Sequence, residues 1–322
     1  MSNETGYVVI IGSSNIDLNI YSKRFPNPGE TVTGGTFKQF LGGKGANQAV
    51  ASIRSGTKTI FIGKIGLDLF GDQMVSQLRD EGINMDHVIR DPQEPSGVAF
   101  ILIDENGENM ISVAPGANFK LTPNEIRSKT EIIKNANAIV VQMEVPTETI
   151  QEVFTIASKG NVIKILNPAP LKPIPQEILN KVDIIVLNEG ELFRLHSLFG
   201  FKNSIKEGKQ KIIHTSRSIA HLGISYIITT LGSKGCIIFN GKKNNFFEVP
   251  ALKVKPVDTV GAGDCFIGVL ASMLSRGETI LDAVKYATVA SSIAVTRKGA
   301  QKSMPFLNEI QKKIKELNGY IK

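Results

Sequence analysis

Short apolar segments alternate with amphipathic segments along most of the chain. The apolar segments are rich in Val, Ile and Leu and are four to six residues long, as buried strands of a parallel sheet usually are; they are 7–12, 59–62, 138–142, 162–166, 183–187 and 226–230. Between most of them, apolar residues recur at the three- and four-residue spacing of a helix, at 45–55, 70–81, 147–158 and 189–198. Strands that alternate with helices predict an α/β fold, in which a mostly parallel sheet carries helices on both faces.

Two segments interrupt this alternation. Residues 19–40 are rich in Gly, Pro and Thr, and residues 97–113 have the pattern of two strands around a turn at 105–108. Neither segment matches a βα unit, so we expect a small β-sheet that projects from the main domain as a lid. The alternative is a pair of surface hairpins without a function.

The C-terminal third has a helical pattern, at 261–276, 280–296 and 305–317. The 322 residues contain no internal repeat and no low-complexity linker. We therefore expect a single α/β domain over residues 1–322, with a discontinuous lid formed by about 19–40 and 97–113.

Composition narrows the classes of protein to consider. No apolar run approaches the roughly 20 residues of a membrane-spanning helix, and the polar segment 1–7 lacks the pattern of a signal peptide. We expect a cytoplasmic protein, with the nucleus also possible if the source is eukaryotic. The two cysteines, Cys236 and Cys265, form no C-x-x-C pair, and the four histidines lack zinc-ligand spacing.

The chain has a formal net charge of +7 and a pI near 9.2. Its densest basic segments, 202–211 and 312–315, are interrupted by acidic or polar residues. A solvated, lysine-rich surface explains this pattern better than a nucleic-acid interface does, and the charge would also help to attract an anionic substrate.

The segment Asp258–Asp264, with the sequence DTVGAGD, indicates chemistry on phosphate. Two glycines precede a long amphipathic helix, so backbone N–H groups at the helix N-terminus are open to an anion. Asp264 falls in the first helical turn, where a carboxylate can take the proton of an attacking hydroxyl, a role worth about 10²–10⁴ in rate. The alternative for Asp264 is an ordinary helix-capping role. Lys38 stands where a Walker A loop ending in Gly43-Lys44 would need glycine, and no G-x-G-x-x-G follows the first apolar segment.

DTVGAGD closely resembles a hallmark of the ribokinase-like, phosphofructokinase-B type sugar kinases. A second hallmark of that family is GGKGANQA at 42–49, and the resemblance extends from residue 8 to about 305. Segments 12–17, 167–170 and 296–301 are similar to the ribokinases within the family. The resemblance implies the Rossmann-like ribokinase fold and phosphorylation of D-ribose at O5 by ATP, giving D-ribose 5-phosphate and ADP.

The resemblance also implies roles for individual residues. Asp264 matches the general base, and Gly261, Ala262 and Gly263 match the anion hole. The positions that match the sugar site are Asn15, Asp17, Gly43, Lys44, Asn47 and Glu144, together with Asp264. Lys44 has an alternative orientation toward solvent, and the glycines at 42–45 have an alternative role in a plain tight turn.

For the nucleotide, Asn188 and Glu191 match a motif tied to Mg²⁺ and phosphate. The other matching positions for ATP are Thr230, Gly232, Gly235, Gly263 and Thr288. Thr288 is equally interpretable as an ordinary helix residue. We expect Cys265, beside the base, to pack in the core and not to react. The resemblance further implies a monovalent-cation site for K⁺ at Asp258, Val260, Ala294, Arg297, Gly299 and Ser303.

Three alternatives remain open from the sequence. The substrate of a related kinase would be deoxyribose, fructose or a nucleoside; a sugar-sensing protein would have lost catalysis; a nucleic-acid-binding protein rests on net charge alone. The free edges of a lid sheet make a homodimer plausible.

Overall fold

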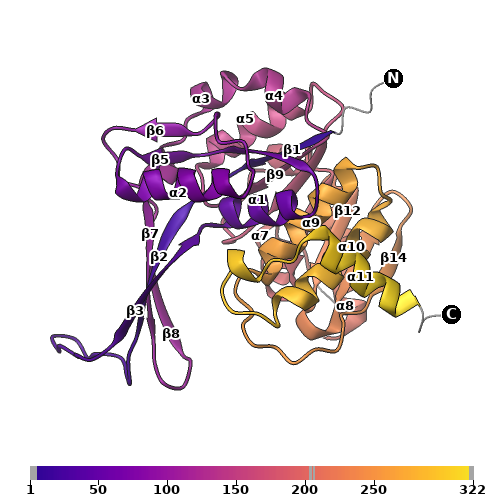
Figure 1. Cartoon of the computed structure of the whole chain (residues 1–322). Helices are drawn as coiled ribbons and strands as arrows, with labels where there is room; N and C mark the ends of the chain where they lie inside the picture. The colour runs from indigo at the N-terminus through magenta and orange to yellow at the C-terminus, as the bar shows by residue number, and fades with distance from the viewer. Residues whose placement is uncertain (1–5, 203–204, 206, 319–322) are drawn as a thin grey trace.

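An eight-stranded sheet forms the centre of the computed structural model, which describes residues 6–202, 205 and 207–318 (Figure 1). The strand order is β14-β13-β12-β11-β10-β9-β1-β4. Six strands of this sheet are parallel to one another, and they are β1 (Tyr7–Ile11), β4 (Lys58–Ile62), β9 (Ala138–Gln142), β10 (Ile163–Asn167), β11 (Ile184–Asn188) and β12 (Tyr226–Thr230). All six agree with the predicted segments to within one residue at either end, and the predicted α/β class is confirmed.

The sheet ends in a hairpin that the alternation did not predict. Strands β13 (Cys236–Asn240) and β14 (Asn245–Val249) are antiparallel to their neighbours. They precede the helical segments predicted at 261–276, 280–296 and 305–317, each of which is a helix in the structure. Asn240-Gly241 between two apolar runs was the available signal, since this dipeptide favours tight hairpin turns.

Alternate residues of the parallel strands enter two separate cores. Val8 and Ile10 of β1 pack on one face, and Val9 and Ile11 pack on the other. The first face is covered by α1 (Lys44–Arg54), α2 (Leu69–Asp80), α9 (Ala262–Ser275), α10 (Ile280–Ala294) and α11 (Leu307–Asn318). The second is covered by α3 (Pro123–Arg127), α4 (Thr130–Lys134), α5 (Thr147–Ala157), α6 (Gln176–Leu179), α7 (Glu189–Leu198) and α8 (Lys209–Ala220). Burial on both faces explains why the strands are apolar throughout.

A second sheet projects away from this body (Figure 1). Its strand order is β3-β2-β7-β8, with β2 at Asn15–Tyr21, β3 at Thr36–Gly42, β7 at Gly97–Ile103 and β8 at Asn109–Ala114. The two segments that interrupted the alternation therefore do form one sheet, although β2 begins four residues earlier than expected. We call these four strands the projecting sheet.

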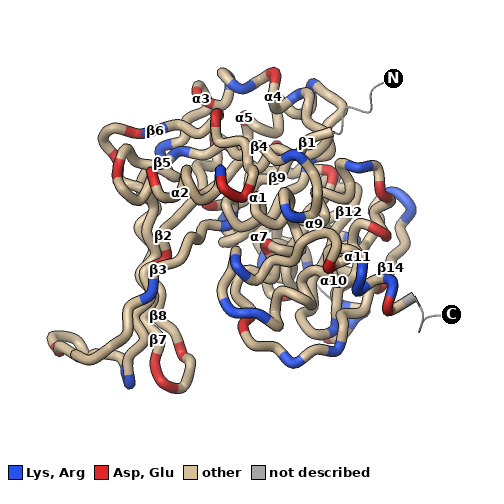
Figure 2. Tube along the Cα trace, in the orientation of Figure 1, with Lys and Arg blue, Asp and Glu red and all other residues tan. Residues whose placement is uncertain are grey.

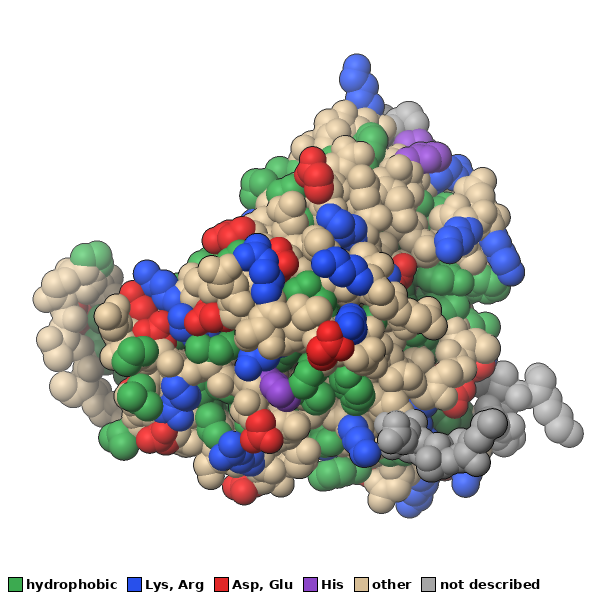
Figure 3. Space-filling model, turned by 90° about the horizontal axis from the view of Figure 1, so that it is seen from above, with side chains coloured by type: hydrophobic (Ala, Val, Ile, Leu, Met, Phe, Trp, Pro, Cys, Tyr) green, Lys and Arg blue, Asp and Glu red, His purple; other side chains and the backbone are tan. Residues whose placement is uncertain are grey.

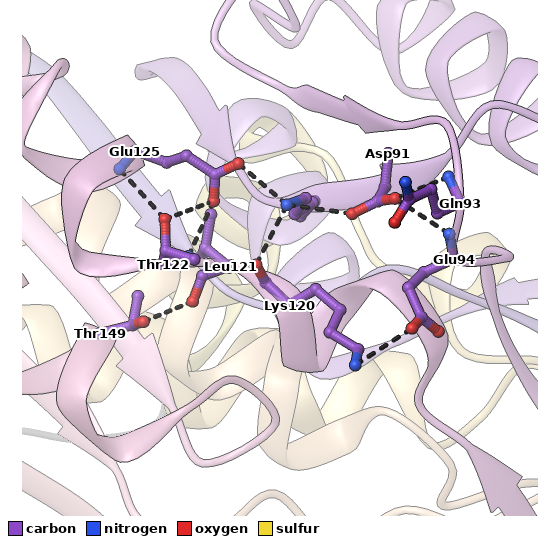
Figure 4. Close-up of polar contacts among 9 residues, drawn as sticks. Asp91, Gln93, Glu94, Lys120, Leu121, Thr122, Glu125 and Thr149 are labelled. Carbon is purple, nitrogen blue, oxygen red and sulfur yellow. Dashed lines mark hydrogen bonds and ion pairs between the residues drawn. The ribbon is translucent and has the colours of Figure 1, made fainter.

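A partly buried lysine joins the elements at the base of the projecting sheet (Figure 4). Lys64, in β5 (Lys64–Gly66), lies 3.0 Å from Asp91 and 2.9 Å from Glu125, and it donates to the carbonyl of Lys120 over 3.1 Å. Asp91 ends β6 (Ile89–Asp91), and Glu125 forms a capping box with Thr122 at the start of α3. The three contacts hold β5, β6 and α3 together where the chain leaves β8 for the body.

The surface charge is dispersed. Figure 2 shows acidic residues between basic ones over much of the trace, and Figure 3 shows both signs side by side on the upper face. Residues 1–5, on which the expectation about a signal peptide depends, and residues 203, 204 and 206 of the basic segment 202–211 lie outside the described residues. Within the described residues, every helix is too short or too polar to cross a bilayer.

Candidate active site

Asp264 lies in the first turn of α9, against the N-terminal half of α1. Its side chain is 9% exposed. Its Oδ1 atom accepts a hydrogen bond from Gln48 Nε2 over 2.9 Å, and its Oδ2 atom accepts one from Asn47 Nδ2 over 3.0 Å. Burial raises the pKa of Asp264, although the charge of Lys44 and the two amide donors oppose that rise. The carboxylate is thus held in one orientation and has a stronger affinity for a proton than an exposed aspartate.

The turn before α9 has the geometry of an anion site. Gly261 adopts a left-handed conformation, with φ of 75°, and a Cβ atom there would lie 2.9 Å from that of Ala300. Gly263 faces open space, and N–H groups in the first turn of a helix have no acceptor within the helix. Ala262 N already donates to the carbonyl of Thr259 over 3.3 Å. The amide of Gly263 is therefore better placed for an anion than that of Ala262.

The glycine cluster before α1 permits close contact between two backbone segments. A Cβ atom on Gly43, where φ is 87°, would lie 2.7 Å from Ser14 Cα, and one on Gly45 would lie 2.8 Å from Ser13 N. A Cβ atom on Gly42 would collide with the carboxylate of Asp17. The glycines thus make a tight turn that also brings the turn between β1 and β2 against the start of α1.

Carboxylates expected to contact the sugar gather beside this turn. Asp17 lies in β2, and burial, reinforced by Glu144 and Asp264, raises its pKa to about 6. One oxygen of Glu144, after β9, accepts hydrogen bonds from the hydroxyl of Ser13 and from Lys44 N. A cavity of ≈ 220 Å³ adjoins these groups, and its lining includes Ser13, Asn15, Val113, Asn118, Glu144 and Lys172.

Lys44 points into the body and not to solvent. It lines a cavity of ≈ 180 Å³ together with Asn188, Glu191, Gly263 and Asp264. Burial lowers the pKa of Lys44, but the nearby Asp264, Glu144 and Glu191 outweigh burial and raise it. A lysine that stays charged at the N-terminus of α1 would attract phosphate oxygens in this cavity.

A larger, mostly apolar cavity continues from the one around Lys44. It has a volume of ≈ 470 Å³, and Thr230 and Gly263 line both cavities. Gly232, Gly235 and the buried Thr288 also line the larger cavity, with Leu252, Val254, Phe266 and Val295. The combination of a small charged cavity and a large apolar one suits the phosphates and the base of a nucleotide.

Asn188 and Glu191 have a local role besides lining the charged cavity. Asn188 Oδ1 accepts from Glu191 N over 2.8 Å, and Glu191 Oε2 accepts from Asn188 N over 2.9 Å. This capping box starts α7. Among the described residues, no group of three or more His, Cys, Asp or Glu side chains is arranged to hold a metal ion.

Asp258 joins the two loops that contain the expected cation positions. Its Oδ1 atom accepts from Val260 N over 3.0 Å, and its Oδ2 atom accepts from Gly299 N over 2.9 Å. Arg297 directs its guanidinium to Glu309, and the hydroxyl of Ser303 donates to the carbonyl of Ala300 over 2.7 Å. The carbonyl of Ala294 accepts from Arg297 N over 3.0 Å. Both oxygens of Asp258 and the carbonyl of Ala294 thus already accept hydrogen bonds from backbone N–H groups.

The amide side chains behind Asp264 and Asn15, those of Gln48 and Asn118, are not among the site residues predicted from the sequence. Gln48 directly follows Asn47 in the glycine-rich hallmark, so its position on α1 was the available signal. Asn118 Nδ2 donates to Asn15 Oδ1 over 2.9 Å, which turns the amide nitrogen of Asn15 away from Asn118.

Cys265, which directly follows Asp264, is buried, and burial chiefly raises the pKa of its thiol to about 12. That environment suits core packing and not reactivity.

Known proteins resemble this chain over nearly its whole length. The sequence profile of the pfkB family carbohydrate kinases matches residues 5–307. The chain is 37% identical to a ribokinase of Staphylococcus aureus, over 95% of this chain and 99% of that protein. It is 35% identical to a deoxyribokinase of Salmonella typhimurium, over 94% and 96%. The structure of Arabidopsis thaliana ribokinase complexed with ribose and ATP superimposes with a TM-score of 0.88, covering 96% of this chain and 98% of that one at 30% identity.

Proposed function

Because this chain belongs to the pfkB family of carbohydrate kinases, we propose that it is a ribokinase, which transfers the γ-phosphoryl group of ATP to O5 of D-ribose. The products are D-ribose 5-phosphate and ADP. The observation that carries this proposal is the position of Asp264, which lines the small charged cavity and lies beside the carboxylates of the proposed sugar site. Relatives named as ribokinases, 34–37% identical over at least 92% of this chain, support the choice of sugar.

Asp264 is the general base in this proposal. Its carboxylate takes the proton of the O5 hydroxyl, and O5 then forms a bond to the γ-phosphorus as the bond from that phosphorus to the β-γ bridging oxygen breaks. ADP leaves with the electron pair of the broken bond. The Gly263 amide, the start of α9 and Lys44 stabilise the negative charge on the transferred group.

Two ions belong to the proposal, and the residues present fit both. Mg²⁺ keeps several water ligands in such sites, so the oxygens of Asn188 and Glu191 at the charged cavity are sufficient protein partners; when bound, it would neutralise phosphate charge. K⁺ would take the carboxylate of Asp258 and oxygens of Val260, Ala294, Arg297, Gly299 and Ser303. A cation there would order the loop that leads into Gly261.

The projecting sheet supplies the lid in this proposal. Val113 of β8 lines the sugar-side cavity, so movement of the sheet toward the body would enclose the sugar. Enclosure excludes water and limits hydrolysis of ATP.

Three apolar side chains on the projecting sheet are more than half exposed, those of Phe37, Phe100 and Ile111, and β3 and β8 are free edges. We therefore include a homodimer, in which a second copy covers the sheet. The compartment we propose is the cytoplasm.

A coupled assay of ADP release tests the proposal. It would compare D-ribose, 2-deoxyribose, fructose and adenosine with MgATP, first in potassium and then in sodium buffer. Turnover highest with D-ribose and greater in potassium is the expected result. Preference for another substrate would overturn ribose as the sugar, and ribose binding without turnover on any sugar would favour a sugar sensor.

A further inference from the structure

A chain of amide side chains leads from the sheet to Asp264. Gln142, the last residue of β9, donates from Nε2 to Gln48 Oε1 over 2.6 Å. Gln48, on α1, donates in turn from Nε2 to Asp264 Oδ1 over 2.9 Å. Both glutamines are fully buried. Three elements thus meet at a single carboxylate through two neutral side chains.

Hydrogen bonding fixes which end of each amide group points toward Asp264. An ionised carboxylate can only accept, so Gln48 must turn its NH₂ group toward Asp264. Its carbonyl oxygen then faces Gln142, which must also present its NH₂ group. The remaining oxygen of Gln142 is buried without a partner, close to Gly12, where a Cβ atom would lie 1.9 Å from that oxygen.

A branch from Gln48 leads to the neighbouring strand. Gln48 Nε2 also lies 3.3 Å from Asn167 Oδ1, at the end of β10, and Asn167 Nδ2 donates to the carbonyl of Val186 over 3.0 Å. Asn167 therefore turns its oxygen to Gln48. The carboxyl ends of β9 and β10 both set the orientation of the glutamine that contacts Asp264.

We propose that Gln48 and Gln142 are positioning residues, which hold the Asp264 carboxylate in the orientation and the ionised state that proton abstraction requires. The proposal rests on the proposed function, since it assumes that Asp264 is the base. Gln142 acts through Gln48 and touches neither the sugar nor the nucleotide cavity.

The other groups that face Asp264 set the background for its titration. Lys44 favours the ionised carboxylate, whereas Glu144 disfavours it. Asp17 and the buried thiol of Cys265 lie close enough that the charge of Asp264 raises their own pKa values. Because burial already raises the pKa of Asp264, losing an amide donor should raise it further. At a given pH the base would then be less ionised, so the rate would fall most at low pH and recover at high pH.

The test replaces each glutamine by methionine, which has a similar length and no amide. Gln142→Met removes the buried Gln142 oxygen that has no partner, but it also leaves Gln48 Oε1 without its donor. Because these two effects oppose each other, we expect the midpoint of thermal unfolding to stay near that of the wild type. We expect the pKa of Asp264 to rise by about one unit and kcat/KM on the acid limb to fall about tenfold. Gln48→Met, which loses the direct contact, should give a larger shift.

Two readouts separate this proposal from the one it rests on. The pKa of Asp264 is measured directly from its carboxyl infrared band, identified by subtraction of Asp264→Asn, and the acid limb of kcat/KM is measured independently. A matched control is Thr59→Val, which removes a buried hydroxyl that contacts Ser52 on the opposite end of α1. We expect Thr59→Val to lower the stability of the fold and to leave unchanged both the pKa from the infrared band and the pKa of the acid limb of kcat/KM.

The possible outcomes distinguish the positioning role from the role of Asp264 as the base. A raised pKa with a matching shift of the acid limb supports both. A raised pKa with an unchanged rate profile supports the positioning role and overturns Asp264 as the base. A pKa that is unchanged in both methionine variants overturns the positioning role, even if their stability falls.

Discussion

Asn47 Nδ2 donates to Asp264 Oδ2 over 3.0 Å, although the two residues are 217 positions apart in the chain. The oxygen of the same Asn47 amide accepts from Gln301 Nε2 over 3.1 Å. Asn47 is also predicted to bind the sugar, and each of its amide atoms has a second hydrogen-bonding position for that role. In this structure it orients the carboxylate of Asp264 and ties it to the loop after α10.

Replacing Asp264 by Asn should lower kcat about 10²–10⁴-fold and leave D-ribose affinity largely intact. The amide keeps the size of the side chain but cannot take a proton. Steady-state rates and calorimetric titration with ribose check this. Asp282→Asn, in the first turn of α10 and far from both cavities, is the control that should retain full activity. Wild-type turnover in Asp264→Asn would rule out Asp264 as the base.

Replacing Asp17 by Asn should weaken sugar binding and stabilise the fold near pH 7. The folded-state pKa of Asp17 is about 6, above its ordinary value of 3.8. Between these values the folded protein binds more protons than the unfolded one, so the contribution of Asp17 to stability falls as pH rises through this window. At pH 7 the gain in Asp17→Asn would be at most about 3 kcal/mol.

Denaturant unfolding at pH 4 and pH 7 measures this effect. The difference between Asp17→Asn and the wild type should be small at pH 4 and large at pH 7. An equal difference at both values would show that the pKa of Asp17 is not raised by burial.

Replacing Asp258 by Ala should abolish stimulation by potassium. The variant loses the proposed anionic ligand and two hydrogen bonds, one from Val260 N within the loop at 258–260 and one from Gly299 N in the neighbouring loop. Rates in matched potassium and sodium buffers check the prediction. Asp183→Ala, which removes a carboxylate paired with Lys164 at the start of β11, serves as the control. Undiminished potassium stimulation in Asp258→Ala would place the cation elsewhere.

Replacing Thr288 by Leu should raise the KM for ATP about tenfold, which corresponds to about 1.4 kcal/mol of binding. Thr288 is buried and lines the larger cavity, so the longer side chain of leucine would occupy space proposed for the base of ATP. The KM for D-ribose should stay unchanged and serves as the internal control. If the KM for ATP also stays unchanged, Thr288 is an ordinary helix residue.

Replacing both Phe100 and Ile111 by Asp should give a monomer if a second copy covers the projecting sheet. The two side chains are more than half exposed, and the strand register places them on opposite faces of the sheet. Sedimentation velocity measures the change. Leu198→Asp, at the exposed end of α7, is the control. A wild-type chain that sediments as a monomer would overturn the homodimer itself.

Much of the fold follows from local patterns in the sequence. The length of the apolar segments specified β1, β9 and β12, because strands buried on both faces need apolar residues at every position. Two glycines before a helical pattern specified an open turn at the start of α9. The antiparallel strands β13 and β14 escaped the alternation, since no helix separates β12, β13 and β14 along the chain.

The composition of the site depended on tertiary structure. Asp264, Gln48 and Gln142 come from α9, α1 and β9, and nothing in the sequence around each one specifies that they meet. Their contact depends on the strand order of the sheet, which places β9 beside β1, and on α1 and α9 packing together on one face. The sequence by itself determined which residues can do chemistry. Only the tertiary structure decided which amides hold Asp264, because hydrogen bonds between distant segments form where packing brings their donors and acceptors within about 3 Å.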